Sequence, residues 1–256
     1  MADRMSIDSS VITPGIYQFH YRGMTLRECW HLGSGLIGCI LGLFFKLIDK
    51  KHFYVWLPAF QTEEICGEDE LSRQAVKQMR PIIENLYRNG YRQGRYYKLT
   101  LNVEKTFKDV GLYRAIHDDR QRFAQVTYTH IDINSKEIKR VCTVAAVFTE
   151  DLLSLTVANN KEFFDDVSCY KSIVLPDNIK SDRILSRLDQ EISDMSAPIK
   201  TFDSFDDLVN IIYAVDNETW SRKIKRGLYK KIPESKERRI LEELGYDPDT
   251  ISNGYI

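Results

Sequence analysis

The chain has 256 residues, of which 43% are hydrophobic and 29% are charged, and its formal net charge is −1. These values are ordinary for a globular protein and exclude collagen-like, low-complexity and disulfide-scaffold proteins. A net charge close to zero also excludes a protein that clamps nucleic acid or an anionic membrane with its whole surface. Such binding would need a local patch of charge.

The five cysteines are widely spaced and contain neither a CxxC pair nor the Cys/His spacing of a structural zinc site. We therefore expect reduced, mostly buried thiols and a cytoplasmic location. The amino terminus lacks the basic and apolar regions of a secretory signal, which agrees with that location.

The first predicted elements are a short strand over 16–21 and a helix that begins near Leu26. Thr25 and Glu28 fit a capping box, in which both side chains satisfy free amides at the start of a helix. The following residues 33–38 match the GxGxxG pattern of dinucleotide-binding folds. The segment before them is too charged for a buried strand, and no repeated βαβ units follow, so we expect no cofactor.

Residues 32–48, LGSGLIGCILGLFFKLI, are the most unusual segment of the chain. Ser34, Gly38 and Gly42 share one helix face at a spacing of four residues, which lets two backbones approach closely. This pattern predicts a helix in the core or in a contact between subunits. The apolar run is shorter than the roughly 20 residues that cross a bilayer, but aromatic residues flank it as at a membrane interface. Membrane anchoring by residues 32–48 stays an alternative.

In the middle of the chain we predict a strand over 52–60 that Pro58 ends, and an amphipathic helix over 68–89 that Asn89 and Gly90 end. Pro81 is expected to kink this helix. An alternating strand over 96–103 and a short helical or loop region over 108–120 follow.

The clearest pattern in the chain is a β-hairpin over 122–149, with a turn at residues 134–137. Its second strand is apolar on both faces, which predicts a central strand that is covered on both sides. The expected cross-strand pairs are Ile133 with Ile138, Phe123 with Phe148, and Asp132 with Lys139.

Helical spacing returns over 182–195, 204–213, 219–229 and 234–244, with Ser204 as an expected amino-terminal cap. The predicted fold class is α+β. A mostly antiparallel sheet is centred on the 122–149 hairpin, joined by the strands near 52–60 and 96–103 and flanked by helices, and the carboxy-terminal third is helical. We expect an α+β core domain over 1–180 and a helical subdomain over 181–256 packed on it.

Two segments interleave aromatic side chains with cations, the combination that binds single-stranded nucleic acid by stacking bases and meeting phosphates. Both also have an ordinary structural explanation, because cations suit helix ends and tyrosines suit a buried strand. The predicted nucleic-acid-binding residues are Tyr87, Arg88, Tyr91, Arg92, Arg95, Tyr96 and Lys98 in the first segment, and Arg222, Lys223, Lys225, Arg226, Lys230 and Lys231 in the second.

Four carboxylates, Asp118, Asp119, Asp132 and Glu137, are of the residue type that holds Mg²⁺ in a metal-dependent nuclease. Two of them already have a structural role in the predicted hairpin: Asp132 pairs with Lys139, and Glu137 lies in the turn. No nucleophile, zinc-protease or phosphate-loop motif occurs, so the sequence identifies no catalytic or metal-binding residue.

These observations lead to one principal hypothesis and two alternatives. The principal one is a non-catalytic cytoplasmic component of a larger assembly that binds nucleic acid or a protein partner, or associates with itself. The first alternative is a metal-dependent phosphodiesterase or nuclease, and the second is a membrane-associated protein.

Overall fold

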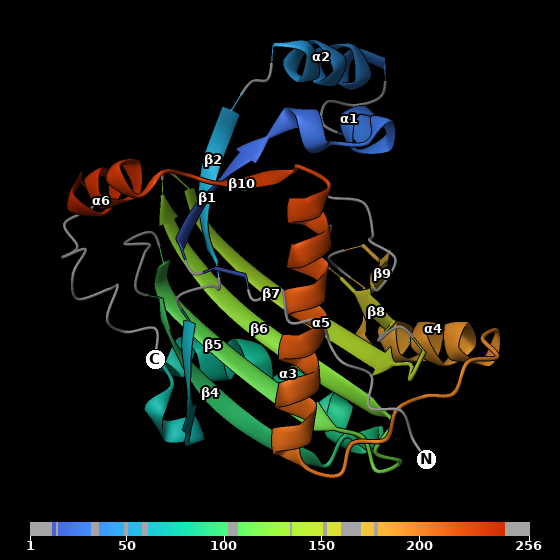
Figure 1. Ribbon diagram of the computed structural model, residues 1–256. Coiled ribbons are helices and arrows are strands. Elements are labelled where there is room, and N and C mark those ends of the chain that lie inside the picture. Colours follow the sequence, from blue (N-terminus) through green and yellow to red (C-terminus); the bar gives the residue numbers. More distant parts are fainter. Residues whose placement is uncertain are drawn as a thin grey trace, which may run out of the picture. The chain divides into compact units, whose positions relative to one another are not determined.

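The computed structural model describes residues 12–13, 15–31, 36–48, 51–57, 61–101, 107–133, 135–150, 153–159, 170–176 and 179–243. The chain forms two compact units, and each contains its own sheet (Figure 1). Unit 1 combines residues 1–60, 163–165 and 216–256, and unit 2 combines residues 61–162 and 166–215. The predicted division into a core domain over 1–180 and a helical subdomain over 181–256 stays a prediction.

Unit 2 is built on a seven-stranded sheet whose strands follow the order β3-β4-β5-β6-β7-β8-β9. All neighbouring strands are antiparallel except β8 and β9, which are parallel. The predicted class, α+β with a mostly antiparallel sheet, is therefore confirmed. The strands are β3 (Gln61–Cys66), β4 (Gln93–Leu101), β5 (Phe107–Ile116), β6 (Arg122–Ile133), β7 (Ser135–Val147), β8 (Ser154–Ala158) and β9 (Tyr170–Val174).

The hairpin of β6 and β7 forms the centre of this sheet as predicted, but the predicted register is wrong. Lys139 lies opposite Thr129 rather than Asp132, a shift of three residues, and β7 begins inside the predicted turn. An odd shift exchanges the two faces of a strand. In the predicted register Val126, which belongs to the first core cluster described below, would lie opposite Ala145, which belongs to the second.

One face of the sheet packs against α3 (Arg73–Arg88) and α4 (Ser181–Ser193) (Figure 1). Met79 from α3 and Leu188 from α4 are fully buried there. They belong to one cluster with alternate residues of the central hairpin, because side chains two apart on a strand share a face. The hairpin residues in this first cluster are Ala124, Val126, Tyr128, Cys142 and Val144.

The boundaries of α3 follow from its capping residues. The Ser72 hydroxyl accepts the amide of Ala75 at 3.0 Å, so the helix begins there and not at Glu68 as predicted. Residues Glu68–Glu70 form a separate short 3-10 helix, η2. The predicted end is confirmed: Asn89 is the carboxy-terminal cap and Gly90 has a φ of +89°, a conformation that suits glycine.

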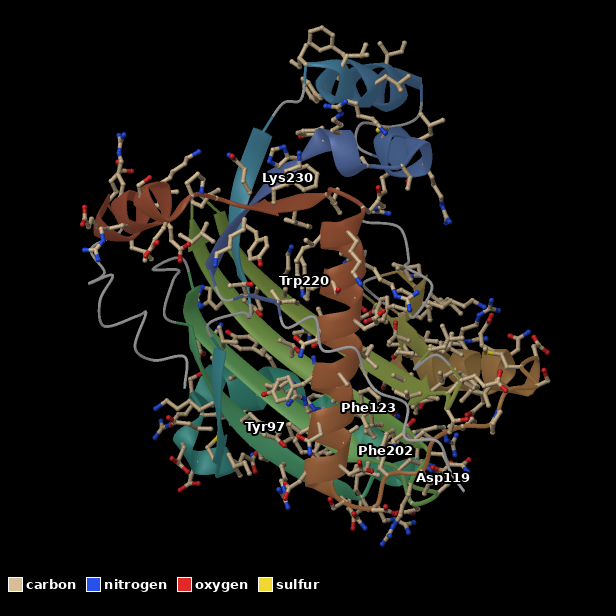
Figure 2. The ribbon with its side chains drawn as sticks, in the orientation of Figure 1. Tyr97, Asp119, Phe123, Phe202, Trp220 and Lys230 are labelled. Atoms are coloured by element: carbon tan, nitrogen blue, oxygen red, sulfur yellow. The ribbon has the colours of Figure 1, made fainter. Side chains whose placement is uncertain are left out.

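The opposite face of the sheet packs against the first half of α5 (Phe205–Lys225). This second cluster includes Phe205 and Leu208 from the helix and Phe123 and Ala145 from the hairpin. Figure 2 shows Phe123 beside Phe202, and their rings meet edge to face with centroids 5.8 Å apart. The central hairpin is therefore covered on both sides, as its apolar sequence predicts.

Unit 1 contains a three-stranded sheet in the order β10-β1-β2 and the helices at both ends of the chain. Its core is aromatic: Phe19 and Trp220 each meet the buried Tyr229 edge to face, at centroid distances of 5.5 and 5.1 Å. The elements are β1 (Gly15–His20), η1 (Tyr21–Gly23), α1 (Leu26–His31), α2 (Leu36–Leu47), β2 (Lys51–Leu57), β10 (Tyr229–Lys231) and α6 (Glu234–Glu243), together with the second half of α5.

Three further predictions need correction. The strand predicted over 52–60 exists as β2 but pairs with β1 in the smaller sheet, not with the central hairpin. Residues predicted to be helical or loop over 108–120 largely form β5, because Val110, Leu112 and their neighbours are buried or half-buried between β4 and β6. The helices predicted over 204–213 and 219–229 are one continuous helix, α5. The carboxy-terminal third is mainly helical, but it also contains β10.

If both faces of the central hairpin are buried in the core, then shortening a buried side chain that packs on either face should lower the stability by a similar amount. We expect Leu188→Ala and Leu208→Ala, both at fully buried positions, each to lower the free energy of unfolding by roughly 2–5 kcal/mol. Urea denaturation would measure this. Val174→Ala, at a position that is 40% exposed, is the control and should cost less than about 1 kcal/mol. A cost below that level at either Leu position would contradict the two-sided core.

Candidate functional site

The first basic-aromatic segment lies at the end of α3 and along β4, in unit 2. Its tyrosines are mostly unavailable for stacking: Tyr91 is 2% exposed, and Tyr96 is half-buried with its ring 4.9 Å from that of Tyr113. Tyr87 is exposed. The segment therefore offers a base little aromatic surface.

The arginines of this segment are exposed but lie beside carboxylates. Arg92 is 2.9 Å from Asp118, and Arg95 is 3.7 Å from Asp206 and also covers the ring of Phe205. Arg88 is 4.0 Å from Glu84, while Lys98 is exposed. A phosphate would have to compete with these acids, so the segment is a weaker anion site than its sequence indicates.

The second basic segment lies in unit 1, at the end of α5 and on β10. Arg222 is 2.6 Å from Glu218, and Arg226 is 2.8 Å from the buried Glu28. Lys223 lies over the Trp220 ring, and Lys225, Lys230 and Lys231 are exposed. Arg222 and Arg226 thus form ion pairs within the chain.

The predicted carboxylates do not gather at one place. Asp118 and Asp119 lie in the turn before β6, whereas Asp132 and Glu137 lie at the far end of β6 and the start of β7. The length of β6 separates the two pairs by about 35 Å at 3.3 Å per residue. No group of acids, histidines and cysteines that could hold a metal ion occurs among the described residues.

Asp119 instead belongs to a polar cluster at the end of the sheet (Figure 2). The Arg122 guanidinium lies 2.7 Å from Asp119 and 2.5 Å from Asp189 of α4, and His117 lies 2.9 Å from Asp119. The Tyr91 ring meets His117 edge to face at 4.9 Å. These contacts attach α4 and the end of α3 to the turn between β5 and β6, so the cluster has a structural explanation.

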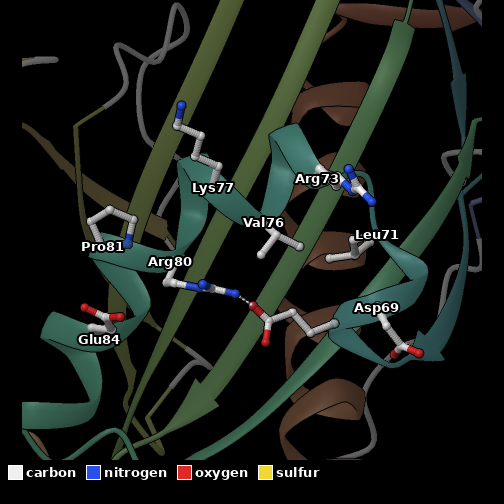
Figure 3. A pocket seen from close by; sticks show the side chains of 9 residues that line it. Asp69, Leu71, Arg73, Val76, Lys77, Arg80, Pro81 and Glu84 are labelled. Carbon is white, nitrogen blue, oxygen red and sulfur yellow. Dashed lines mark hydrogen bonds and ion pairs between the residues drawn. The ribbon is translucent and has the colours of Figure 1, made fainter.

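A surface pocket of about 840 Å³ lies along α3, next to η2 (Figure 3). An ion pair of 2.7 Å between Arg80 and Glu68 crosses it, and Leu71 and Val76 provide apolar surface. The pocket carries charges of both signs and no matched set of donors or acceptors, so its chemistry does not indicate a ligand class. Its lining is Glu68, Asp69, Leu71, Arg73, Val76, Lys77, Arg80, Pro81 and Glu84.

The most unusual surface belongs to the hairpin of helices α1 and α2 in unit 1. The predicted capping box at its start is confirmed: the Glu28 carboxylate accepts the Thr25 amide at 2.6 Å, and the Thr25 hydroxyl accepts the Glu28 amide at 3.1 Å. Glu28 is fully buried and also pairs with Arg226. This network fixes α1 to the end of α5.

Three residues of α2 hold it against the preceding elements. A Cβ at Gly42 would lie only 2.5 Å from the Cβ of Cys29, so glycine is needed for the close approach of α1 and α2. The Phe45 ring lies 5.0 Å from that of Tyr21, and Lys46 Nζ donates to the carbonyl of Met24 at 2.5 Å. The only charged side chain of α2, Lys46, is therefore half-buried at the edge of this contact.

The outer side of α2 consists of large apolar side chains that are between 41% and 85% exposed. At 100° per residue they occupy a continuous arc of about 160° around the helix. Ile48 continues the helical turn, since its amide donates to the carbonyl of Phe44 at 3.1 Å. We call this surface the apolar arc; it comprises Ile40, Leu41, Leu43, Phe44, Leu47 and Ile48.

The sequence predicted the glycine spacing of this segment but not its exposed face. Gly42 makes its close contact inside the chain, while Ser34 lies outside the described residues and the surroundings of Gly38 are not described. Their role in a contact between subunits stays a prediction. A helix that is apolar nearly all round, as segment 32–48 is, predicts burial, so the sequence contained no sign that the arc is exposed.

The described cysteines agree with the expectation of reduced thiols. Cys29, Cys66 and Cys142 are free, and only Cys66 is not buried. Burial raises the pKa of Cys142 to about 12, so its thiol is protonated at neutral pH and is not a nucleophile.

Comparison with known proteins identifies no relative of this chain. No protein-family model, curated protein or solved structure matches it. Within the described residues, no helix has both the length and the apolar character needed to traverse a membrane.

The polar cluster around Asp119 predicts a dependence of stability on pH. Burial by itself raises the pKa of Asp119, but hydrogen bonds from the Gln121 amide, His117 and Arg122 outweigh it and hold the pKa below the ordinary value. This stabilisation is complete above the unfolded-state pKa of about 4 and is lost as the pH falls through the lower, folded-state pKa.

We therefore expect Asp119→Asn to destabilise the protein at pH 7 and to become neutral in acid. Urea denaturation of both proteins at several pH values would measure the difference. Asp194→Asn, which removes an exposed carboxylate after α4, controls for the change in net charge and should show little effect. A stability difference that does not shrink below about pH 4 would contradict the assignment.

The buried pair of Glu28 and Arg226 gives a second prediction. Glu28→Ala leaves the Arg226 charge without its partner and should lower the free energy of unfolding by roughly 3 kcal/mol. The double variant Glu28→Ala, Arg226→Leu should recover part of this loss, since neither charge is then left alone. If the double variant were less stable than either single variant, then the unpaired charge of Arg226 would not be the cause of the stability lost in Glu28→Ala.

Proposed function

We propose that this protein binds the surface of a lipid bilayer through the apolar arc of α2. The observation that supports this function is the composition of the exposed face of α2: it consists of large apolar side chains, while the only charged side chain of the helix, Lys46, is half-buried and donates to the Met24 carbonyl. Surface helices of globular proteins have the opposite arrangement. A contiguous exposed apolar surface of this kind marks a site of contact with a partner or a membrane.

The composition of the arc favours lipid over a protein partner. Protein interfaces are enriched in Tyr, Trp and Arg and carry polar groups at the rim. The arc contains five aliphatic side chains and Phe44, with no hydrogen-bonding group among them. Hydrocarbon chains need no such groups, so lipid matches this surface.

The length of α2 fixes how it would meet the bilayer. Its 12 residues span about 18 Å, against a hydrocarbon thickness of about 30 Å. The helix would therefore lie along the interface with its arc in the acyl region. Removing six half-exposed side chains from water would contribute roughly 1 kcal/mol each, which is enough for reversible attachment.

The hairpin is already ordered before it meets lipid. The contact between Gly42 and Cys29, the capping box at Thr25 and the Glu28–Arg226 pair hold α2 in place without a partner. Binding would therefore cost little conformational entropy. The nucleic-acid hypothesis has weaker support, because Tyr91 is buried, Tyr96 is half-buried, and the arginines lie beside carboxylates.

The test replaces three residues of the arc in the full chain: Leu43→Gln, Phe44→Gln and Leu47→Gln. We expect flotation with vesicles of phosphatidylcholine and phosphatidylserine to fall at least about tenfold, because each change removes a large apolar contact. All three side chains are exposed, so the melting temperature should stay within a few degrees.

The matched control is Ile65→Gln on β3, where the isoleucine is 62% exposed but lies outside the arc. It should bind vesicles like the unchanged protein. Failure of the unchanged protein to bind any vesicle would contradict the proposal. A concentration-dependent dimer that the triple variant abolishes would instead assign the arc to a second copy of the chain.

A further inference from the structure

The exposed charges on the described residues of the helical hairpin, 21–31 and 36–48, are all positive. Within residues 21–31 and 36–48, the only acidic side chain is Glu28, which is fully buried and paired with Arg226. The charged side chains that reach the surface there are Arg22, Arg27 and Lys46. The whole chain has a net charge of −1, so this cationic bias is local.

Two of these cations lie near the carboxyl end of α2. The ring contact of Tyr21 with Phe45 and the hydrogen bond from Lys46 to Met24 place η1 against this end of α2. Arg22 is the exposed residue of η1. The Lys46 ammonium has three donors and uses one of them on Met24, so two remain for an anion.

Arg27 has a different position in the hairpin. It precedes Cys29 by two residues, which turns it about 200° around α1 from the side that meets Gly42. Its side chain is exposed but belongs to the far side of α1. Arg27 is therefore a cation of the same hairpin that lies farther from α2, and it serves as the comparison for Arg22.

We infer that the bilayer bound by α2 is one with anionic headgroups, which Arg22 and Lys46 would meet while the apolar arc enters the acyl region; this inference rests on the proposed function. An amphipathic helix binds anionic membranes when basic side chains border its apolar face, and lysine and arginine stems reach from the acyl boundary to the headgroups. The cytoplasmic leaflet carries such lipids, which agrees with the predicted cytoplasmic location. Each cation near the surface should strengthen binding roughly fivefold.

The experiment compares the full chain on vesicles of phosphatidylcholine alone and with about 30 mol% phosphatidylserine. We expect the phosphatidylserine vesicles to bind at least about tenfold more tightly, and the difference to shrink as the salt rises from about 0.05 to about 0.5 M. Arg22→Glu should remove most of the preference, and Arg27→Glu should have a smaller effect. Arg183→Glu, an exposed arginine on α4 in unit 2, is the control and should leave binding unchanged.

The outcomes separate this inference from the function on which it rests. Equal binding to both kinds of vesicle would overturn the anionic preference and leave attachment through α2 intact. No binding to either kind would overturn the proposed function itself. Soluble glycerophosphoserine that binds as tightly as the vesicles would show that the cations form a site for a free phosphate ester and would also overturn the inference.

Discussion

The fold of unit 2 depends on one constraint: both faces of the β6–β7 hairpin are apolar and must be kept from water. An antiparallel strand pair with one polar face can leave it to solvent, but this pair cannot. Val126 and Val144 require the cover of α3 and α4, and Phe123 and Ala145 require that of α5. A register shifted by an odd number of residues would move the side chains of one strand to the opposite face, against different helices.

The polar contacts of the protein serve mainly to fix its elements. Arg122 joins the turn before β6 to α4, and the capping box at Thr25 and the Glu28–Arg226 pair fix α1. Several residues that have the chemistry of a binding or catalytic site are thus used in internal ion pairs. Residue type alone overestimates such sites, since an arginine next to a carboxylate has already lost much of its attraction for phosphate.

The hairpin of α1 and α2 differs from this general pattern. Glu28 is buried and Lys46 is half-buried, whereas the large apolar side chains of the arc are exposed. Such an arrangement leaves apolar surface in water, so a stable protein retains it when the surface has a use. The proposed attachment to an anionic bilayer accounts for both the apolar arc and the sign of the charges beside it. Glycine at position 42 brings α2 close enough to be held by α1.

The sequence by itself determined the elements whose signals are local. The capping box at Thr25, the end of α3 at Gly90 and the two-sided apolar character of the central hairpin could all be read from neighbouring residues, because caps and periodicity depend on short spacings. Only the tertiary structure decided the partner of each strand and the exposure of each side chain. β2 pairs with β1 instead of the central hairpin, and the apolar arc lies outside instead of in the core, because both depend on contacts between residues far apart in the chain, which no local pattern contains.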